Sequence, residues 1–220
     1  MRAEDQLEEG DVIELYFTPG AASLAVHGLL EEVGAEYRLV RVTKEDGKVD
    51  PPELPSLNPH VRVPTMVDGD LVMFESAACV MYLCDEHPEA GLAPALGTRE
   101  RALWYRWLTY LTNTVQAAFM VYFYPSRATD DAQAEDGIAT KTAASLAGMR
   151  DHLEGELAAN GPYILGERFT SADLYLAMLT RWGRRLPEKW WDQPQLGAHY
   201  RLVTERPAIK RVYEQEGLEE

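Results

Sequence analysis

The chain has 220 residues, of which 46% are hydrophobic, so it can bury one large core or two smaller ones. Its formal net charge is −15, whereas nucleic acids and anionic membrane surfaces are bound by basic patches. We therefore predict that neither nucleic acid nor a membrane is a partner, and no apolar run reaches the about 18–20 residues of a membrane span.

The chain begins with a polar, acidic stretch, MRAEDQLEEGD, which has no signal-peptide pattern. We expect residues 1–11 to form a flexible leader and the protein to be cytoplasmic. The two cysteines, Cys79 and Cys84, are expected on different faces of one helix, so they should not form a disulfide. Because the sequence has no CxxC or Cys/His spacing typical of metal ligands, we predict buried thiols in a reducing compartment and no metal site.

A strand, a helix and a second strand are predicted next. Residues 12–17 are β-branched or aromatic at several positions, which favours a strand. Residues 22–33 have apolar side chains at helical spacing and are followed by Gly34, a typical helix C-cap. Residues 36–42 alternate again, so the three elements predict a βαβ unit with parallel strands.

The following segment, residues 45–60, contains four prolines and is expected to be a loop. Two short apolar runs between residues 63 and 74 are separated by Asp68-Gly69, which predicts an antiparallel hairpin. Residues 75–87 are then expected to form a helix that closes the α/β part of the chain.

Beyond this helix the sequence predicts further helices and no convincing strand. Apolar spacing favours helices at 99–124 and 136–159 and in three later stretches, FTSADLYLAMLTRW, QPQLGAHYRLVTER and PAIKRVYEQEG. Thr170 and Asp173 have the spacing of a capping box at the start of the first of these three. The expected divisions are a leader (1–11), an α/β domain (12–88), a linker (89–98) and an all-helical domain (99–220).

Four stretches in this order resemble glutathione S-transferases, most closely those of the bacterial beta class. They are LYFTPGAASLAVH, LNPHVRVPTMVDGDLVMFESAACVMYL, GERFTSADLYLAML and ERPAIKRVYEQEGL, and they extend from Leu15 to Leu218. The resemblance implies the glutathione S-transferase fold, which is a thioredoxin-like α/β N-terminal domain (βαβ-ββα) followed by an all-α C-terminal domain. It also implies a homodimer that binds glutathione.

The resemblance implies a glutathione site in the N-terminal domain. Val63-Pro64 resembles the family's cis-proline, so the N–H and C=O of Val63 should pair with the cysteinyl part of glutathione. Glu75 and Ser76 should hold the γ-glutamyl ammonium and carboxylate, and Arg62 should reach the tripeptide backbone. From the residues alone, an ordinary proline, an N-cap serine and a surface glutamate remain open.

The basic residue that meets the glycyl carboxylate is left open among Lys44, Lys48 and His60, each of which is also an ordinary surface residue.

The usual catalytic residues of the family are missing. The resemblance places Ala22 where the beta class has a cysteine, and Ala21 at about the position where other classes have a serine. Gln116 stands where the beta class commonly has a histidine, and Thr109 stands where it has an asparagine. The chain therefore keeps the glutathione-binding frame and departs from the catalytic pattern.

Three side chains are candidates for lowering the pKa of the glutathione thiol, which is about 8.5 for a free cysteine. Ser23 is the preferred one, because it lies in the first turn of a helix whose N–H groups and dipole favour an anion. Tyr16 is the second, although strand alternation sends Tyr16 and Phe17 to opposite faces and does not say which one faces the site. Thr18 is the third, and it is expected to be a turn residue.

The electrophilic substrate is expected along the long helix of the C-terminal domain. The candidate contacts fall at about one-turn intervals and are Tyr105, Thr109, Asn113 and Gln116. The loop with Trp190 and Trp191 could cap a substrate pocket, although packing onto the helical domain is the favoured interpretation.

These expectations lead to three functional hypotheses. The first is a glutathione transferase of the detoxification type, which binds glutathione as a thiolate and conjugates it to an electrophilic small molecule. The second is a non-catalytic binding or scaffold protein, which the alanines at positions 21 and 22 motivate. The third is an enzyme that uses glutathione as a returned cofactor, in an isomerisation or a peroxide reduction.

Overall fold

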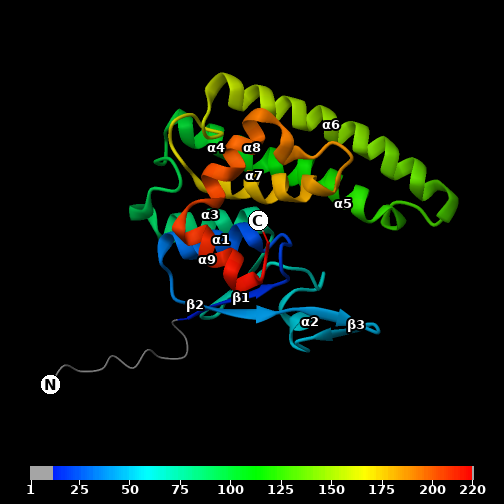
Figure 1. Ribbon diagram of the computed structural model, residues 1–220. Coiled ribbons are helices and arrows are strands. Elements are labelled where there is room, and N and C mark those ends of the chain that lie inside the picture. The colour runs from blue at the N-terminus through cyan, green and yellow to red at the C-terminus, as the bar shows by residue number, and fades with distance from the viewer. Residues whose placement is uncertain (1–11, 220) are drawn as a thin grey trace. The chain divides into compact units, whose positions relative to one another are not determined.

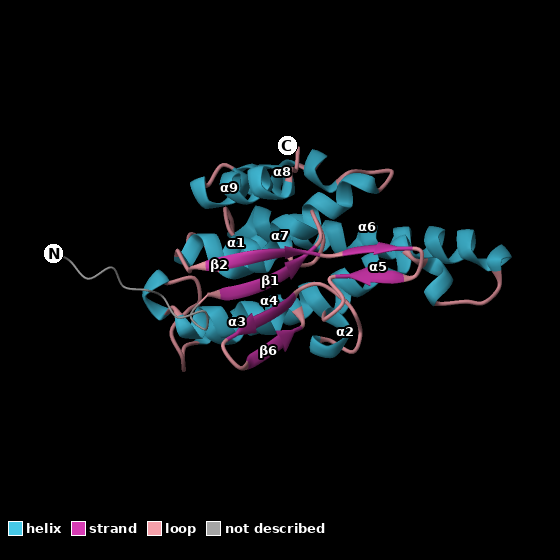
Figure 2. Cartoon of the chain, turned by 90° about the horizontal axis from the view of Figure 1, so that it is seen from below, coloured by secondary structure: helices cyan, strands magenta, loops and turns pink. Residues whose placement is uncertain are grey.

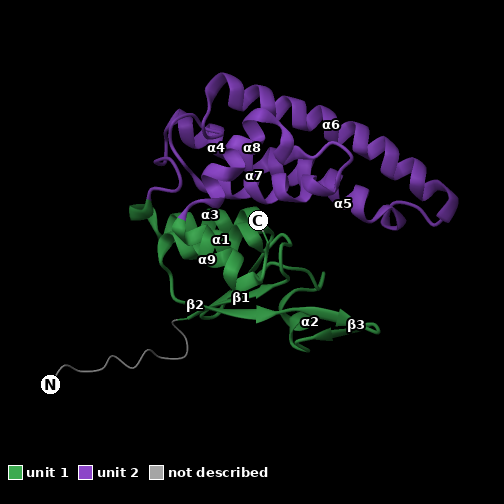
Figure 3. Ribbon diagram, in the orientation of Figure 1, with its two compact units in different colours: residues 1–90, 207–220 green, residues 91–206 purple. Residues whose placement is uncertain are grey.

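The computed structural model describes residues 12–219 of the chain (Figure 1). The expected leader, residues 1–11, lies outside the described residues. The chain forms two compact units, one with the described residues up to Ala90 and from Pro207 onward, the other with Gly91–Arg206 (Figure 3).

The unit boundaries differ from the expected domains at both ends of the helical part. The last helix, α9 (Pro207–Glu216), belongs to the first unit because it packs along α1 (Leu24–Val33), with Ile209 and Val212 buried. The expected linker 89–98 is likewise packed over part of its length. Leu92 belongs to the second unit and is buried there, and its carbonyl oxygen accepts a hydrogen bond from the backbone N–H of Ser171 in the same unit.

The first unit is built on a sheet that, within residues 12–219, has four strands in the order β2-β1-β5-β6 (Figure 2). The strands are β1 (Ile13–Phe17), β2 (Tyr37–Arg41), β5 (Thr65–Asp68) and β6 (Leu71–Phe74). β1 and β2 are parallel, and β5 is antiparallel to both β1 and β6. The predicted βαβ unit and the predicted hairpin are both confirmed.

Helices cover both faces of this sheet. Phe17 at the end of β1 packs edge-on against His27 of α1, and α1 in turn contacts α3 (Ser76–Glu86) and α9 on the same face (Figure 1). Tyr16 faces the other way and packs with Val42 and with Leu54 of α2 (Leu54–Leu57). Because both faces are covered, Leu15, Tyr16 and Phe17 are all buried.

The expected loop over residues 45–60 contains structure that the sequence analysis missed. A small hairpin of β3 (Thr43–Glu45) and β4 (Lys48–Asp50) precedes α2. Asp46 and Gly47 form its turn with positive φ values of 49° and 76°. Asp46-Gly47 is the same turn signal as Asp68-Gly69, but its strands have three residues each and are mostly exposed, so no apolar alternation marks them.

The secondary structure of the second unit, over its described residues, consists of helices and one isolated bridge between Tyr163 and Gly166. Its helices are α4 (Arg99–Tyr110), α5 (Ala117–Phe123), α6 (Glu135–Asn160), α7 (Ser171–Trp182) and α8 (Pro194–Thr204). Short turns add η3 (Pro125–Arg127), η4 (Ala132–Ala134), η5 (Gly183–Arg185) and η6 (Trp190–Asp192), and the first unit has η1 (Pro88–Ala90). The long helix expected at 99–124 is interrupted by a π-helical segment, η2 (Leu111–Gln116).

Every residue of α7 is buried, and the predicted capping box at its start is confirmed. In the part of the chain that the structure describes, no helix is both long enough and apolar enough to cross a membrane.

Candidate active site

Strand register brings three segments of the first unit to one end of its sheet. Tyr16 at the end of β1 pairs with Thr65 at the start of β5, and Thr65 pairs with Phe74 at the end of β6. The turn after β1, the Val63-Pro64 segment before β5 and the start of α3 after β6 therefore lie next to one another. These are the three segments in which the sequence analysis placed its glutathione-binding and thiol-activating residues.

The turn between β1 and α1 presents backbone donors. The N–H of Ala21 donates to the carbonyl oxygen of Thr18 (3.0 Å), and that of Leu24 donates to Ala21 (3.1 Å). The N–H groups of Ala22 and Ser23 have no hydrogen-bond partner among residues 12–219. Two free donors at the N-terminus of a ten-residue helix favour an anion at this position.

The two hydroxyl groups of this turn are used inside the fold. Ser23 has no exposed surface, and its Oγ donates to the carbonyl oxygen of Thr18 at 3.4 Å. Thr18 Oγ1 donates to the carbonyl oxygen of Val42 at 3.1 Å. The hydroxyl of Ser23, the preferred activator in the sequence analysis, thus has an acceptor within its own turn, and its backbone N–H has none among residues 12–219.

Tyr16, the second candidate activator, faces α2 and not the turn. Its hydroxyl lies 3.3 Å from Glu53 Oε1 and 3.4 Å from Glu14 Oε2. Burial and these two carboxylates raise the pKa of Tyr16 to about 12. Strand alternation correctly separated Tyr16 from Phe17, and Phe17 is the residue that faces α1.

A buried carboxylate from the last helix fixes the turn. Glu216 Oε2 accepts a hydrogen bond from the N–H of Gly20 (2.7 Å), and Glu216 Oε1 lies 2.8 Å from His27 Nδ1. Neither the Glu216 nor the His27 side chain has exposed surface. The sequence analysis missed this pair, because the two residues are 189 positions apart and no local pattern joins them.

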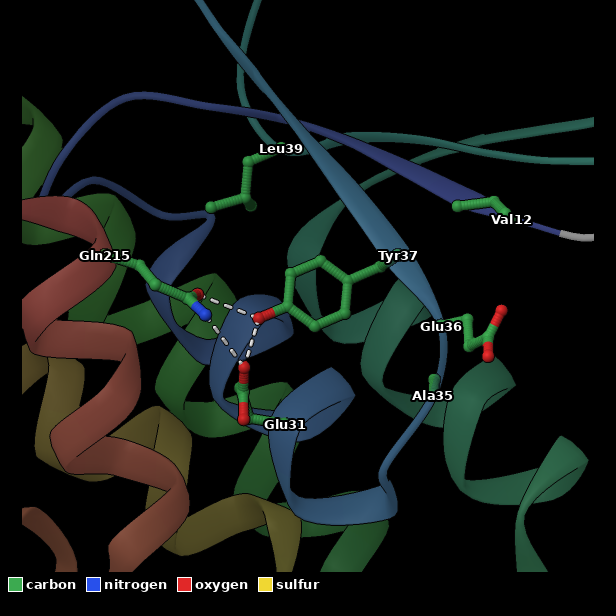
Figure 4. Close-up of a pocket in the computed structure, with 7 residues that line it drawn as sticks. All are labelled: Val12, Glu31, Ala35, Glu36, Tyr37, Leu39 and Gln215. Atoms are coloured by element: carbon green, nitrogen blue, oxygen red, sulfur yellow. Dashed lines mark hydrogen bonds between the residues drawn. The ribbon is translucent and has the colours of Figure 1, made fainter.

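An open pocket on the first unit lies next to this pair and is lined by residues that include Glu31, Tyr37 and Gln215 (Figure 4). Glu31 accepts hydrogen bonds there from Tyr37 Oη, from Gln215 Nε2 (3.1 Å) and from Arg211 Nε (2.6 Å). Although burial opposes the effect, these hydrogen bonds lower the pKa of the Glu31 carboxyl. The polar groups of this pocket thus bond one another and hold α9 against α1.

The second segment exposes a backbone donor and acceptor at Val63. The Val63-Pro64 peptide bond is cis, as the sequence analysis expected. The N–H and C=O of Val63 have no partner in the described part of the chain. An extended peptide can pair with such groups as a strand pairs with a sheet edge.

Buried Asn58 holds the segment around Val63 in shape. Its Nδ2 donates to the carbonyl oxygen of Arg62 (3.2 Å) and to Thr65 Oγ1 (3.0 Å), and its Oδ1 accepts from the N–H of His60 (2.9 Å). Asn58 was not a predicted site residue, although it lies in the stretch that carries the family resemblance. The Arg62 side chain is exposed.

The third segment is the start of α3. Glu75 is exposed and has a positive φ of 71°, a backbone conformation that often occurs at functional sites in residues other than glycine. Ser76 Oγ and the N–H groups of Ser76, Ala77 and Ala78 have no partner within residues 12–219. A hydroxyl and three N–H groups at a helix start provide the donors that a carboxylate requires.

The candidates for the glycyl carboxylate are Lys44, Lys48 and His60, and their surroundings differ. Lys44 Nζ donates to the carbonyl oxygen of Val61 at 2.5 Å, so Lys44 is already tied to the Val63 segment. The His60 ring packs edge-on against Phe74, and Lys48 is exposed on β4.

The expected electrophile contacts all lie on α4 and the π-helical segment of the second unit. Tyr105, Thr109 and Asn113 are exposed, and Gln116 is half-buried and accepts a hydrogen bond from the hydroxyl of Tyr175. Short π-helical insertions are frequent at functional sites, and this one contains two of the four predicted contacts.

The tryptophan loop packs within the second unit, as the favoured interpretation expected. Trp190 has no exposed surface and lies 5.0 Å from Phe119, centroid to centroid. A Cβ atom on Gly183 would lie 2.3 Å from Trp190 Cγ, so the ring occupies the space that only glycine leaves.

Two family models match the chain. Residues 11–85 match the model described as glutathione S-transferase, N-terminal domain, and residues 113–216 match glutathione S-transferase, C-terminal domain. The chain therefore belongs to the glutathione S-transferase family, and the α/β part of its first unit, up to α3, is the thioredoxin-like domain of that fold.

Similar proteins include relatives from several bacteria. YncG of Escherichia coli K12, described as an uncharacterized GST-like protein, is 32% identical over 206 residues, 91% of this chain and 97% of that protein. A sphingomonad glutathione S-transferase solved in complex with glutathione is 31% identical, with a TM-score of 0.79, and the match covers 94% of this chain and 100% of that one. The beta-class enzyme of Sphingomonas chungbukensis is 28% identical with a TM-score of 0.82, at 94% and 100% coverage.

Proposed function

We propose that this protein is a glutathione transferase that binds glutathione as a thiolate and conjugates it to an electrophilic small molecule. The observation that carries the proposal is a row of polar groups at one end of the sheet that have no partner among residues 12–219, from Ala22 and Ser23 through Val63 to Ser76. Each of these groups belongs to a segment that the N-terminal family model covers.

The proposed roles follow from the chemistry of each group. The N–H and C=O of Val63 pair with the cysteinyl residue of glutathione. Ser76 Oγ and the N–H groups at the start of α3 bind the γ-glutamyl carboxylate, and Glu75 accepts from the γ-glutamyl ammonium. Arg62 is exposed beside Val63 and binds the tripeptide backbone.

The thiol is activated by backbone N–H groups in this proposal. The N–H groups of Ala22 and Ser23 donate to the sulfur, and the dipole of α1 favours its negative charge. A hydrogen bond to a charged group contributes about 1.5–3 kcal/mol, which lowers a pKa by about one to two. That is enough to make the thiolate abundant at neutral pH without a cysteine at position 22.

The electrophile is proposed to contact Tyr105, Thr109, Asn113 and Gln116. We further propose a cytoplasmic homodimer with a role in detoxification, which the family supports. Leu71 and Val72, which are 39% and 37% exposed on the edge strand β6, provide an apolar surface for such an assembly. Sedimentation equilibrium of the purified protein tests the dimer, and a monomer at micromolar concentration contradicts it.

Affinity chromatography tests glutathione binding. The protein is expected to be retained on immobilised glutathione and to elute with free glutathione. A panel of electrophiles then tests conjugation, with glutathione consumption and product formation measured together. Consumption without a glutathione adduct indicates a returned or oxidised cofactor, and binding without any turnover indicates a scaffold.

Replacing Ser76 by alanine is expected to weaken glutathione binding roughly 10- to 100-fold, because one hydrogen bond to the carboxylate is lost. The pKa of the bound thiol should stay the same, because Ser76 lies in the segment after β6 and not in the turn after β1. Isothermal titration calorimetry measures the affinity. Ser145→Ala, on an exposed face of α6, is the control, and equal affinities for the two variants contradict the role of Ser76.

A further inference from the structure

The hydroxyl of Tyr16 is placed between two carboxylates on the α2 face of the sheet. Glu14 lies on the same face of β1, and Glu53 directly precedes α2. Glu14 also accepts a hydrogen bond from Arg38. Within the described part of the chain, the Tyr16 hydroxyl is the hydrogen-bond partner of the Glu53 side chain.

The Tyr16 ring joins the same segment at a second place. It forms a buried cluster with Val42 and Leu54, against which Val61 and Val63 are packed. The ring and the hydroxyl of one residue therefore contact the start of α2 and the side-chain layer beneath the Val63 segment.

The contacts continue from α2 to the groups proposed to bind glutathione. The N–H of Asn58 donates to the carbonyl oxygen of Leu54 (2.9 Å), so Asn58 is fixed to the last turn of α2. The Asn58 amide in turn holds the carbonyl oxygen of Arg62, the residue before Val63. A displacement of α2 would move the Val63 backbone.

The Tyr16 hydroxyl has one proton to donate, and the other contacts of Glu14 and Glu53 indicate which of the two carboxylates accepts it. Glu14 already has Arg38 as a hydrogen-bond donor, whereas no second hydrogen bond is formed by the Glu53 side chain among residues 12–219. Donation to Glu53 therefore satisfies both carboxylates, and it ties α2 to the strand that leads into the turn.

We infer that Tyr16 is a positioning residue for glutathione, which holds α2 and through it the Val63 backbone by its hydrogen bond to Glu53. This inference rests on the proposed glutathione site. It gives Tyr16 a role in the affinity for glutathione rather than in the activation of the thiol. Glu53 is exposed, so substituting it removes its hydrogen bond with Tyr16 without leaving a cavity in the core.

Tyr16→Phe is the variant that tests the inference, because phenylalanine keeps the ring in the cluster and removes the hydroxyl alone. We expect its glutathione affinity to fall about 3- to 10-fold, with the pKa of the bound thiol unchanged. Glu53→Ala should match it, Glu53→Gln should keep most of the affinity through its amide oxygen, and the double variant Tyr16→Phe/Glu53→Ala should lose no more than either single variant.

The matched control is Tyr82→Phe. The Tyr82 hydroxyl also donates to a carboxylate of the first unit, Asp68 Oδ2 (2.7 Å), and its pKa is likewise raised to about 12, mainly by that hydrogen bond. Asp68 lies at the far end of β5 from Val63, so Tyr82→Phe should leave glutathione affinity unchanged.

Amide hydrogen exchange gives a readout that does not need glutathione. The N–H groups of Ser56, Asn58 and Val61 are hydrogen-bonded in the structure, and they should exchange about 3- to 10-fold faster in Tyr16→Phe than in the parent or in Tyr82→Phe. If the parent protein does not bind glutathione at all, the proposed function fails and with it the role in affinity, and the exchange rates then decide whether the Tyr16 hydroxyl holds α2.

Two results would overturn the inference. One is a raised pKa of the bound thiol in Tyr16→Phe with unchanged affinity, which would make Tyr16 the activator. The other is an affinity and an exchange pattern in Tyr16→Phe that are the same as in Tyr82→Phe.

Discussion

Replacing Asp173 by alanine is expected to lower the free energy of unfolding of the second unit by about 3–5 kcal/mol. The Asp173 carboxylate is completely buried and accepts from the N–H groups of Ile164 (2.8 Å) and Thr170 (2.8 Å) and from Thr170 Oγ1 (3.1 Å). His199 Nε2 lies 3.0 Å from it. Alanine would leave two backbone donors and a histidine buried without their acceptor.

The five tryptophans of the chain all lie between residues 104 and 191, so tryptophan fluorescence in a denaturant titration follows the second unit. Asp131→Ala is the matched control, because Asp131 caps η4 by the same type of bond to the N–H of Gln133 (2.9 Å) but is exposed. Its expected cost is about 1 kcal/mol or less. Equal costs for the two variants would contradict the role assigned to burial.

Replacing Glu216 by alanine is expected to destabilise the first unit by a similar amount, about 3–5 kcal/mol, and to abolish measurable glutathione binding. The variant leaves the N–H of Gly20 and the Nδ1 of His27 without their buried partner. Gly20 lies in the same turn as the N–H groups of Ala22 and Ser23, which have no partner among residues 12–219, so the loss of its anchor releases the proposed thiolate site.

Amide exchange in α1 and far-ultraviolet circular dichroism measure this effect, because the first unit contains no tryptophan in its described residues. Glu214→Ala, on the exposed face of the same helix, should change neither stability nor binding. Full glutathione affinity in a folded Glu216→Ala variant would mean that the turn keeps its shape without the carboxylate.

Features with a local chemical signal were predictable from the sequence. The hairpin at Asp68-Gly69 and the capping box of Thr170 and Asp173 depend on residues within a few positions of each other, and both are confirmed. The helix end at Gly34 is confirmed as well, with a φ of 70°. The family resemblance predicted the order of an α/β domain followed by a helical domain.

Features that depend on distant residues were not predictable. The sequence of α9 shows an apolar face but does not show which helix covers that face, which is α1. The hydrogen bonds of Glu216 with His27 and Gly20 were not predictable for the same reason, because they join residues far apart in the sequence. Short exposed strands such as β3 and β4 bury too little apolar surface to mark the sequence.

The face that Tyr16 takes depended on packing with distant segments, whereas the Ser23 hydroxyl depends on the turn just before it. Alternation predicted that Tyr16 and Phe17 point to opposite faces, and the packing of α1 and α2 decided which face each one takes. Ser23 was preferred because of its place in the helix, whereas the carbonyl oxygen of Thr18 takes its hydroxyl. The place of Ser23 at the helix start does not by itself say where its hydroxyl donates.

Ultraviolet titration of the thiolate of bound glutathione tests the central claim most directly, in the parent protein and in Ser23→Ala. The account predicts a pKa about one to two below the value of about 8.5 for a free thiol. It also predicts the same curve for Ser23→Ala, because the backbone N–H groups of Ala22 and Ser23 remain in that variant. A bound thiol that titrates like free glutathione, or a pKa that rises by one or more in Ser23→Ala, would contradict activation by the backbone of the turn.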